Sequence, residues 1–295
     1  MSYPGMPEIS RYLPNESLLR QTEDESDFME ATVELIKEAS IYVTVAGQIL
    51  PYGKSGWSRD QGILCGLIVR ASKFMGAVLD QTCQHRREVV DLLARIIFET
   101  IVNARYLIFN NDPALFNSYV QYSLRSEKQL WERVDREVAS RGGQILPAEE
   151  RIRKSILKSF ESSGVKLEEV DFNDKEGWSI PDSIYGRAVK VGLKAGFQAL
   201  YMLPNHAVHG NWEDLHRNHL KRTSDGLFVP HGDWHEPRPQ ALLGLGILSL
   251  DLTRDYWKYI DSTFPDSIRQ SLDELEGRIR KVFDLHEEFI QRVTN

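Results

Sequence analysis

The chain has 295 residues, with 36 Lys and Arg, 43 Asp and Glu, and two cysteines. This length fits one large domain or two small ones, and the scarcity of cysteine excludes a small disulfide-stapled scaffold. The hydrophobic share of 41% argues against wholesale disorder, and the net charge of −7 means that a nucleic acid would have to be bound by a local basic patch.

The N-terminal leader, residues 1–26, is acidic and lacks the basic start and apolar run of a signal peptide. The longest weakly polar stretch, residues 62–79, is interrupted by Arg70 and Lys73, so we do not expect it to span a membrane. Cys65 and Cys83 are isolated and are expected to be buried, reduced thiols. We therefore predict a cytoplasmic protein without a membrane partner.

Apolar residues recur at helical spacing through most of the chain, whereas the alternation typical of strands is nearly absent. The sequence thus predicts an all-α fold, a multi-helix bundle. In chain order, we expect helices over about 27–50, 58–81, 86–109, 113–140, 181–203, 239–260 and 265–293. The pattern is strongest in 86–109.

Two segments depart from the helical pattern. Residues 147–177 combine a short basic helix with an acidic, weakly patterned stretch, which we interpret as a variable insert or lid. Residues 221–239 read as a loop with a small hairpin that turns at Ser224-Asp225-Gly226. Residues 27–295 are otherwise expected to form a single helical domain.

The helix expected over 86–109 carries a polar ridge. Asp91, Arg95, Glu99 and Asn103 follow one another at four-residue steps, among large apolar residues. Arg95 and Glu99 could form a buried structural pair, a solvated pair of the ordinary i,i+4 kind, or a functional pair.

A second group of polar residues lies near the end of the helix expected over 181–203. Tyr201, Asn205 and His209 fall on one stripe if the helix continues through Pro204 with a kink. A histidine can take and give protons near neutral pH, and a neighbouring Asn or Tyr can fix its tautomer. Alternatively, His209 caps a helix end before Gly210 or forms a hydrogen bond in the core.

Histidines are dense between residues 206 and 235, which hold six of the eight. If a helix ran through Gly210, His206, His209, Glu213 and His216 would form a metal-binding face, and the protein could be a metal-dependent enzyme. However, the chain has no second Glu-x-x-His, and Gly210 is typical of a helix end. We therefore expect no metal and no cofactor.

Three motifs resemble those of a known group. They are Arg95-x3-Glu99-x3-Asn103-x2-Tyr106, Gly177-Trp178 and Tyr201-x3-Asn205-x3-His209-Gly210. Together they resemble an uncharacterised bacterial all-helical family, a "domain of unknown function" whose members carry an Arg-x3-Glu helix and a later Tyr-x3-Ser-x3-His-Gly. The resemblance covers roughly residues 62–212, and Asn205 stands where a Ser would be usual.

That group is similar in outline to HEPN domains, helical bundles that often dimerise and, in active members, cleave RNA without metal through an Arg-x(4–6)-His motif. Asn205 and His209 match the polar residue and the histidine, but Pro204 stands where the arginine is expected. The resemblance therefore implies a HEPN-like core that is either catalytically silent or active with an arginine from another helix. Arg95 is our candidate.

The resemblance also implies roles for residues. His209 would assist proton transfer while a ribose 2′-hydroxyl attacks the adjacent phosphate, and a guanidinium would hold the developing charge. The candidate catalytic residues are His209, Arg95, Glu99, Asn205 and Tyr201. The candidate substrate-binding residues are Arg151, Arg153, Lys154, Lys158, Arg217, Lys221 and Arg222. Such basic clusters also occur on ordinary solvated faces.

Two functions from different classes follow. The first is an RNA-cleaving or RNA-binding protein of bacterial stress or phage defence, a homodimer whose partners are RNA and a protein from the same operon. This setting comes from the resemblance alone. The second is a catalytically inactive interaction module, in which the candidate catalytic residues form a buried polar network that fixes the packing of two helices.

Overall fold

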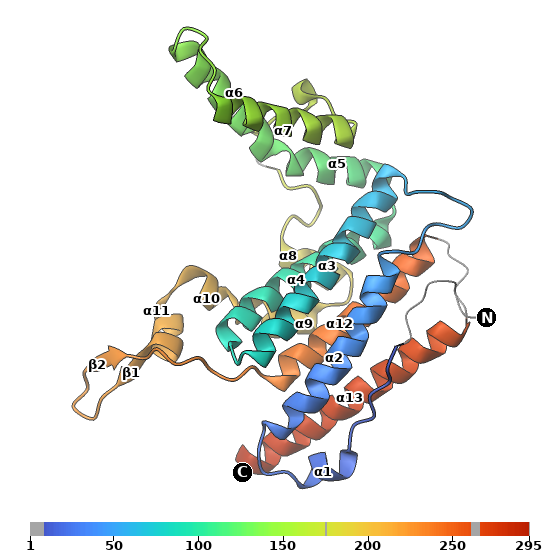
Figure 1. The fold of residues 1–295 in the computed structure, drawn as a ribbon, viewed down its shortest axis with the longest axis vertical. Helices are drawn as coiled ribbons and strands as arrows, with labels where there is room; N and C mark the ends of the chain where they lie inside the picture. Colours follow the sequence, from blue (N-terminus) through green and yellow to red (C-terminus); the bar gives the residue numbers. More distant parts are fainter. Residues whose placement is uncertain (1–8, 175, 261–265, 295) are drawn as a thin grey trace. The chain divides into compact units, whose positions relative to one another are not determined.

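The computed structural model describes residues 9–174, 176–260 and 266–294, apart from the side chains of residues 205 and 206. The described residues are mostly helical, with one antiparallel pair of short strands (Figure 1). The predicted all-α class is confirmed. The chain divides into two compact units: residues 1–108 with 188–295, and residues 109–187.

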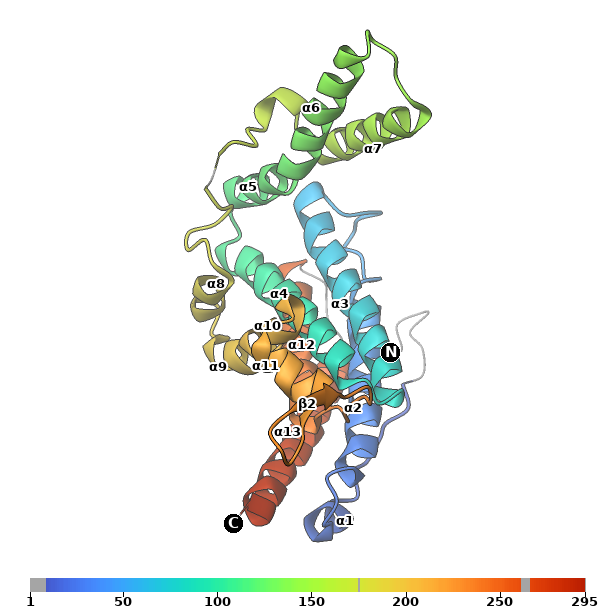
Figure 2. The same ribbon diagram turned by 90° about the vertical axis from the view of Figure 1, so that its left-hand side faces the viewer.

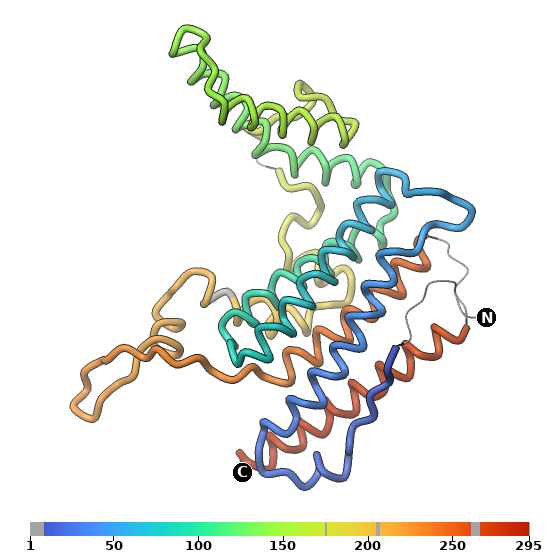
Figure 3. The backbone as a smooth tube through the Cα atoms, in the orientation of Figure 1, coloured from blue at the N-terminus to red at the C-terminus, as the bar shows by residue number. Residues whose placement is uncertain are grey.

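Long helices build the first unit. They are α2 (Asp27–Ala46), α3 (Arg59–Cys83), α4 (Arg87–Asn110), α12 (Pro239–Tyr259) and α13 (Asp266–Thr294), with a short α1 (Glu16–Gln21). Helices α2, α12 and α13, from opposite ends of the chain, lie side by side, as the backbone trace shows (Figure 3). Their buried faces, with Phe28, Leu35, Leu243 and Leu272, form the core of this unit.

A glycine allows the closest of these approaches. A Cβ added to Gly246 of α12 would lie 2.5 Å from Ile36 Cδ1 of α2 and 3.3 Å from Ile279 Cδ1 of α13. Only glycine leaves room for both neighbours, so this position fixes how tightly α12 can pack between its partners.

Several helix boundaries follow from capping signals in the sequence. Ser58 begins α3 with a capping box, in which its backbone N–H donates to Gln61 Oε1 at 3.1 Å and its hydroxyl accepts from Gln61 N at 3.4 Å. The helices expected over 27–50, 58–81, 86–109, 239–260 and 265–293 are present with ends shifted by a few residues.

A set of short elements leads from the end of the second unit, at residue 187, to α12 of the first unit. In order they are α8 (Ile184–Lys190), α9 (Lys194–Phe197), the π-helical turn η2 (Gln198–Met202), α10 (Asn205–His209), α11 (Trp212–Asp214), a second π-helical turn η3 (Leu215–His219), β1 (Leu220–Arg222) and β2 (Phe228–Pro230). The strands pair with Lys221 opposite Val229, and Gly226 has a φ of 86° in the turn. The predicted hairpin is therefore confirmed.

The prediction of one continuous helix over 181–203 is wrong. Gly192 ends α8 with a φ of 75°, Leu193 N donates to Ala188 O at 2.7 Å, and Gly192 N donates to Val189 O at 3.2 Å. This pair of bonds is a Schellman cap, which satisfies the last carbonyls of α8 and prevents its continuation.

The second unit contains α5 (Pro113–Ser123), α6 (Arg125–Ser140), α7 (Pro147–Ser163) and a 3-10 turn, η1 (Leu167–Glu169). The single helix expected over 113–140 is wrong because Leu124, with a ψ of −2°, interrupts it, and α5 and α6 run in different directions (Figure 2). Trp178 is buried here against Tyr119, with ring centroids 5.0 Å apart. Residues 147–177, interpreted as an insert, lie inside this unit, which begins at residue 109.

Helix α3 contains both cysteines. Cys65 is buried and donates to Gly47 O at 3.4 Å, whereas Cys83, the last residue of α3, is exposed. The expectation of two buried thiols is therefore wrong for Cys83, which ends the helix and is exposed.

Among the described helices, α3 is long and apolar enough to cross a membrane by length and composition alone. Core helices of other proteins meet the same criterion, and Leu64, Ile68 and Ala71 of α3 are fully buried. The expectation of no membrane partner stays a prediction.

Candidate functional site

Two of the predicted site residues, 106 positions apart, meet in the first unit. Arg95 on α4 donates from Nη2 to the Tyr201 hydroxyl of η2 at 3.2 Å. The same guanidinium lies over the Tyr201 ring, 4.4 Å from its centroid. A hydrogen bond and a cation–π contact from one pair of side chains fix the position of both.

Aromatic packing supports this pair from the other side. The Tyr201 ring stacks on Phe197 with centroids 4.9 Å apart and lies 6.4 Å from Phe98 of α4. Gly196 permits this packing, because a Cβ there would lie 3.1 Å from Phe98 Cε2. The aromatic cluster thus holds η2 against α4 and presents the Tyr201 hydroxyl to Arg95.

Glu99 and Asn103 continue the ridge of α4 and are both half-buried. Glu99 forms no hydrogen bond or ion pair with a described residue, so none of the three Arg95–Glu99 pairs considered from the sequence is formed. Asn103 Oδ1 is buried and lacks a hydrogen-bond partner among the described residues. The ridge therefore carries polar groups that α4 itself does not satisfy.

His209 is the last residue of α10 and is exposed. Its ring makes no hydrogen bond or ion pair with any residue that the structure describes. Gly210 follows with a φ of 54° and ends the helix. Between η2, which ends at Met202, and α10, which begins at Asn205, Leu203 and Pro204 keep right-handed helical backbone angles, so the chain continues through Pro204 with a change from π-helical to α-helical geometry. The Asn205 side chain lies outside the described residues, and its role stays a prediction.

The predicted substrate-binding residues form two sets. Arg151, Arg153, Lys154 and Lys158 lie on α7 in the second unit, and Arg217, Lys221 and Arg222 lie on η3 and β1 in the first. Several are paired with acids: Arg153 with Asp135, Lys154 with Glu150 at 2.8 Å, Arg217 with Glu213, and Lys221 with Asp233 at 4.0 Å. Arg151, Lys158 and Arg222 are exposed and have no ion pair within the described part of the chain.

The described histidine side chains between residues 206 and 235 do not gather with acids or thiols at one common site. His235 Nδ1 lies 2.6 Å from Glu88 Oε1, and His219 Nε2 lies 3.4 Å from Asp214 Oδ2. No three His, Cys, Asp or Glu side chains gather as a possible metal site within the described residues, which do not include the His206 side chain. The metal-binding face considered from the sequence required a helix through Gly210, where α10 ends.

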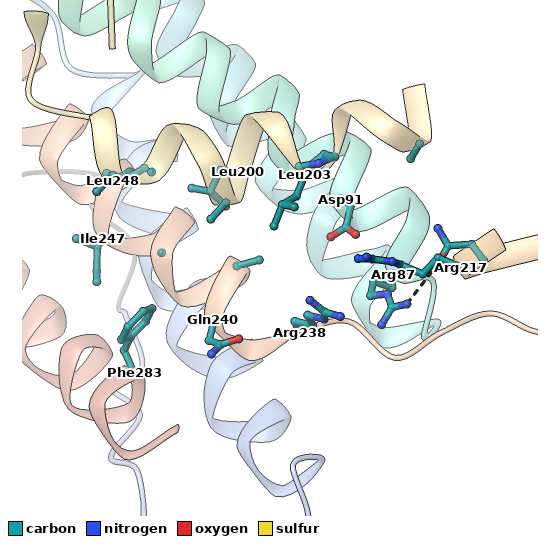
Figure 4. Close-up of a pocket in the computed structure, with 18 of the residues that line it drawn as sticks. Arg87, Asp91, Leu200, Leu203, Arg217, Arg238, Gln240, Ile247, Leu248 and Phe283 are labelled. Carbon is teal, nitrogen blue, oxygen red and sulfur yellow. Dashed lines mark hydrogen bonds between the residues drawn. The ribbon is translucent and has the colours of Figure 1, made fainter. Parts of the chain in front are cut away.

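The first unit also contains a cavity of about 660 Å³ between η2, α10, α12, α13 and the start of α4 (Figure 4). Leu200, Leu203, Ile247, Leu248 and Phe283 form an apolar wall. Charged groups gather at the other end, where Arg87, Asp91, Arg217 and Arg238 point toward one another (Figure 4).

Burial strongly affects the ionisation of this charged end. Burial raises the pKa of Asp91 from 3.8 to about 6, although Arg87 and Arg238 oppose the shift. Burial also lowers the pKa of Arg87, and the nearby charge of Arg238 lowers it further. These groups are therefore close together in a partly dry environment, where charge is costly.

Sequence reasoning missed Arg87 and Arg238. A signal existed for Arg87, because it precedes Asp91 by four residues and so extends the ridge of Asp91, Arg95, Glu99 and Asn103 by one step. No local pattern marks Arg238, which lies 151 positions further along the chain and joins the cavity only through the position of α12.

A family model described as a family of unknown function, DUF5677, matches residues 61–227. The match includes Arg95, Tyr201 and His209 and ends before Arg238. No curated protein and no solved structure matches the chain. Because the matched segment is more than half of the chain, the protein belongs to the DUF5677 family.

Proposed function

We propose that this member of the DUF5677 family is a HEPN-like protein that binds RNA and cleaves it without a metal ion, using Arg95, Tyr201 and His209. One observation carries the proposal: Arg95 of α4 contacts Tyr201, which lies in the segment that leads directly to His209. The sequence motif lacks its arginine because Pro204 occupies that position. Arg95 is a replacement that reaches this segment from another helix.

Arg95 is suited to hold phosphate. A guanidinium has five N–H donors in a planar fork that matches the geometry of a phosphate group. The ring below it restrains its orientation, so less side-chain entropy is lost when it binds an anion. Its role is to stabilise the negative charge that develops on the phosphate during attack.

His209 supplies the proton transfer. The imidazole accepts the proton of a ribose 2′-hydroxyl while the 2′ oxygen forms a bond to phosphorus, and the bond from phosphorus to the 5′ oxygen breaks. The proton returns to the 5′ oxygen through a water molecule. The products are a 2′,3′-cyclic phosphate and a 5′-hydroxyl. The exposure of His209 and its lack of a described partner support this role, because a base must reach substrate.

RNA is drawn to the first unit by local charge, since the whole chain carries −7. Lys221 and Arg222 on β1 are exposed, and we assign them phosphate contacts together with Arg217. The homodimer, the partner protein from the same operon, the cytoplasmic location and the defence setting stay predictions.

A non-enzymatic interaction module is the second candidate. The half-buried Arg95–Tyr201 pair favours it, because this pair and its aromatic neighbours join η2 to α4 whatever happens at His209. In that case the pair is a structural connection and His209 has no chemical role.

RNA cleavage by purified protein in the presence of a chelator tests the proposal. We expect wild type to leave 2′,3′-cyclic phosphate ends, and His209→Ala to lower the rate by about 100-fold or more. His85→Ala is the matched control: His85 is another exposed histidine, paired with Glu236, and its loss should leave the rate unchanged. Equal or absent cleavage by wild type and His209→Ala would remove the proposal.

Arg95→Lys separates the two candidates. Lysine keeps the positive charge but loses the fork and most of the stacking on Tyr201. Catalysis predicts that the cleavage rate falls far more than the thermal stability does. The interaction module predicts a fall in thermal stability alone, with no cleavage in any variant.

A further inference from the structure

The cavity of the first unit has the size and lining of a small-molecule site. Its volume of about 660 Å³ lies within the range of about 300 to 1,000 Å³ typical of such sites. Leu200 of η2, Leu248 of α12 and Phe283 of α13 line its apolar part (Figure 4). Gly244 on α12 widens it, because a Cβ added there meets no atom within 4 Å.

The charged end of the cavity holds two guanidinium groups that lack an acidic partner. Arg87 and Arg238 form no ion pair with a described residue, and the side chain of Arg87 has one described partner, the neutral Asn218 Oδ1 at 3.5 Å. Arg238 is close enough to lower the pKa of Arg87. Two like charges at a partly buried position repel one another, and an anion between them would relieve the repulsion.

The other acids of this region do not neutralise the two arginines. Glu213 is paired with Arg217, and Asp214 accepts a hydrogen bond from Asn218 Nδ2 at 3.0 Å. Asp91 forms no ion pair with Arg87 or Arg238 within 4.0 Å, and a single carboxylate does not neutralise two guanidinium groups even when it is ionised. The charged end therefore retains positive charge.

We propose that this cavity binds a small amphipathic anion, a phosphate or carboxylate head group between Arg87 and Arg238 with an apolar chain against Leu248 and Phe283. The proposed site does not use Arg95, Tyr201 or His209, and it shares with the proposed RNA contacts only Arg217, which lies at its charged end. The chain of such a ligand loses water contact along the apolar wall, at about 25 cal/mol per Å² of buried apolar surface. The head group supplies the negative charge that pairs with the two arginines.

Calorimetric titration of the full chain tests the site, with decyl phosphate and decanoate as probes below their micelle-forming concentrations. We expect saturable 1:1 binding of at least one of them, and the stronger binder identifies the head group. Inorganic phosphate has the anionic head group without the apolar chain, and decanol has the chain without the anion. Each should bind at least about 10-fold more weakly. Absence of saturable binding by both amphiphiles would overturn the proposal.

Cavity-filling variants and a charge-removing variant locate the binding site. Gly244→Leu fills the cavity from its open side and should abolish binding, whereas Gly277→Leu, the same change at an exposed position of α13, should leave it intact. Arg87→Gln with Arg238→Gln should weaken binding at least about 10-fold, and Arg133→Gln, an exposed arginine of α6, should not. Ala241→Leu, a second cavity-filling change, and circular dichroism guard against a misfolded variant. Unchanged binding by folded Gly244→Leu and Ala241→Leu would refute the site.

Discussion

Asp91 shows how burial and charge compete at a single residue. Its carboxyl has a pKa of about 6 in the folded protein, above the ordinary value of 3.8, because burial outweighs the attraction of Arg87 and Arg238. A raised carboxyl pKa means that the folded state binds the proton more tightly than the unfolded state does. The contribution of Asp91 to the free energy of unfolding is therefore fully present below about pH 4 and is lost as the pH rises through about 6.

Asp91→Asn removes this titration and should stabilise the protein at higher pH. At pH 7.5 we expect its free energy of unfolding to exceed that of wild type by about 1 to 3 kcal/mol, since one pKa unit corresponds to about 1.4 kcal/mol. At pH 4 the two proteins should be equally stable. Urea unfolding at several pH values measures the difference. A pH-independent difference between Asp91→Asn and wild type would contradict the prediction.

At this scale the sequence identified part of the candidate site. Four-residue spacing singled out Arg95, and the Tyr201-x3-Asn205-x3-His209 pattern singled out Tyr201, and these two residues do meet. The sequence could not show that the Arg95 guanidinium would contact Tyr201 rather than Glu99, because that choice depends on how closely η2 approaches α4. The partnership of Arg87 with Arg238 likewise depends on the tertiary structure.

Helix α12 contains two glycines whose surroundings differ sharply. A Cβ at Gly246 would meet Ile36 Cδ1 at 2.5 Å, and Ile36 is itself only 1% exposed, so the contact can be relieved only by moving the core. A Cβ at Gly244, two residues earlier, would point into open space. The two positions lie on one helix, but only Gly246 is restricted to glycine by its neighbours.

Alanine at each glycine should therefore have opposite effects. Gly244→Ala should raise the free energy of unfolding by about 0.5 to 1 kcal/mol, because alanine loses less backbone entropy in a helix. Gly246→Ala gains the same amount but forces side chains in a packed core to shift, and we expect a net loss of about 1 to 2 kcal/mol. Thermal unfolding of both variants measures the contrast. Equal stability of the two would show that α12 is not held tightly at Gly246.

The strength of the local sequence signals explains which elements the sequence predicted. The long helices α2, α3, α4, α12 and α13 carry strong apolar periodicity, and signals such as the Ser58 capping box mark their ends. The sequence does contain a signal for the Schellman cap, which is Gly192 itself. The helical pattern on both sides of this glycine concealed that signal. The break at Leu124 had none, because leucine favours helix and no proline or glycine lies beside it.

At the scale of the whole molecule, the first unit is built from both ends of the chain. Helix α2 packs against α12 and α13, and each of these contacts spans about two hundred residues. Such pairings leave no mark in local periodicity, so the sequence could predict a helical bundle but not which helices are neighbours. A buried ion pair shows how this long-range packing is fixed.

Glu38 of α2 and Arg278 of α13 form that ion pair. Arg278 donates to both carboxylate oxygens at 2.7 Å, and Glu38 also accepts from Tyr12 N at 3.2 Å. The Glu38 and Arg278 side chains are only 4% and 12% exposed. One bidentate contact therefore connects α13 both to α2 and to the N-terminal segment before α1.

Arg278→Ala should lower the free energy of unfolding by about 3 to 5 kcal/mol, because it leaves the Glu38 carboxylate buried without its counter-charge. Arg20→Ala is the matched control: Arg20 pairs with Glu288 at 3.1 Å on the surface, and its loss should cost less than about 1 kcal/mol. Replacing both partners, Glu38→Leu with Arg278→Met, should recover most of the loss, since the cost lies in the unpaired charge. Urea unfolding of the single and double variants measures all three values. If the double variant is no more stable than Arg278→Ala, the unpaired charge is not the main cost. The hydrogen bond from Tyr12 N to Glu38 would then contribute most of the stability at this junction.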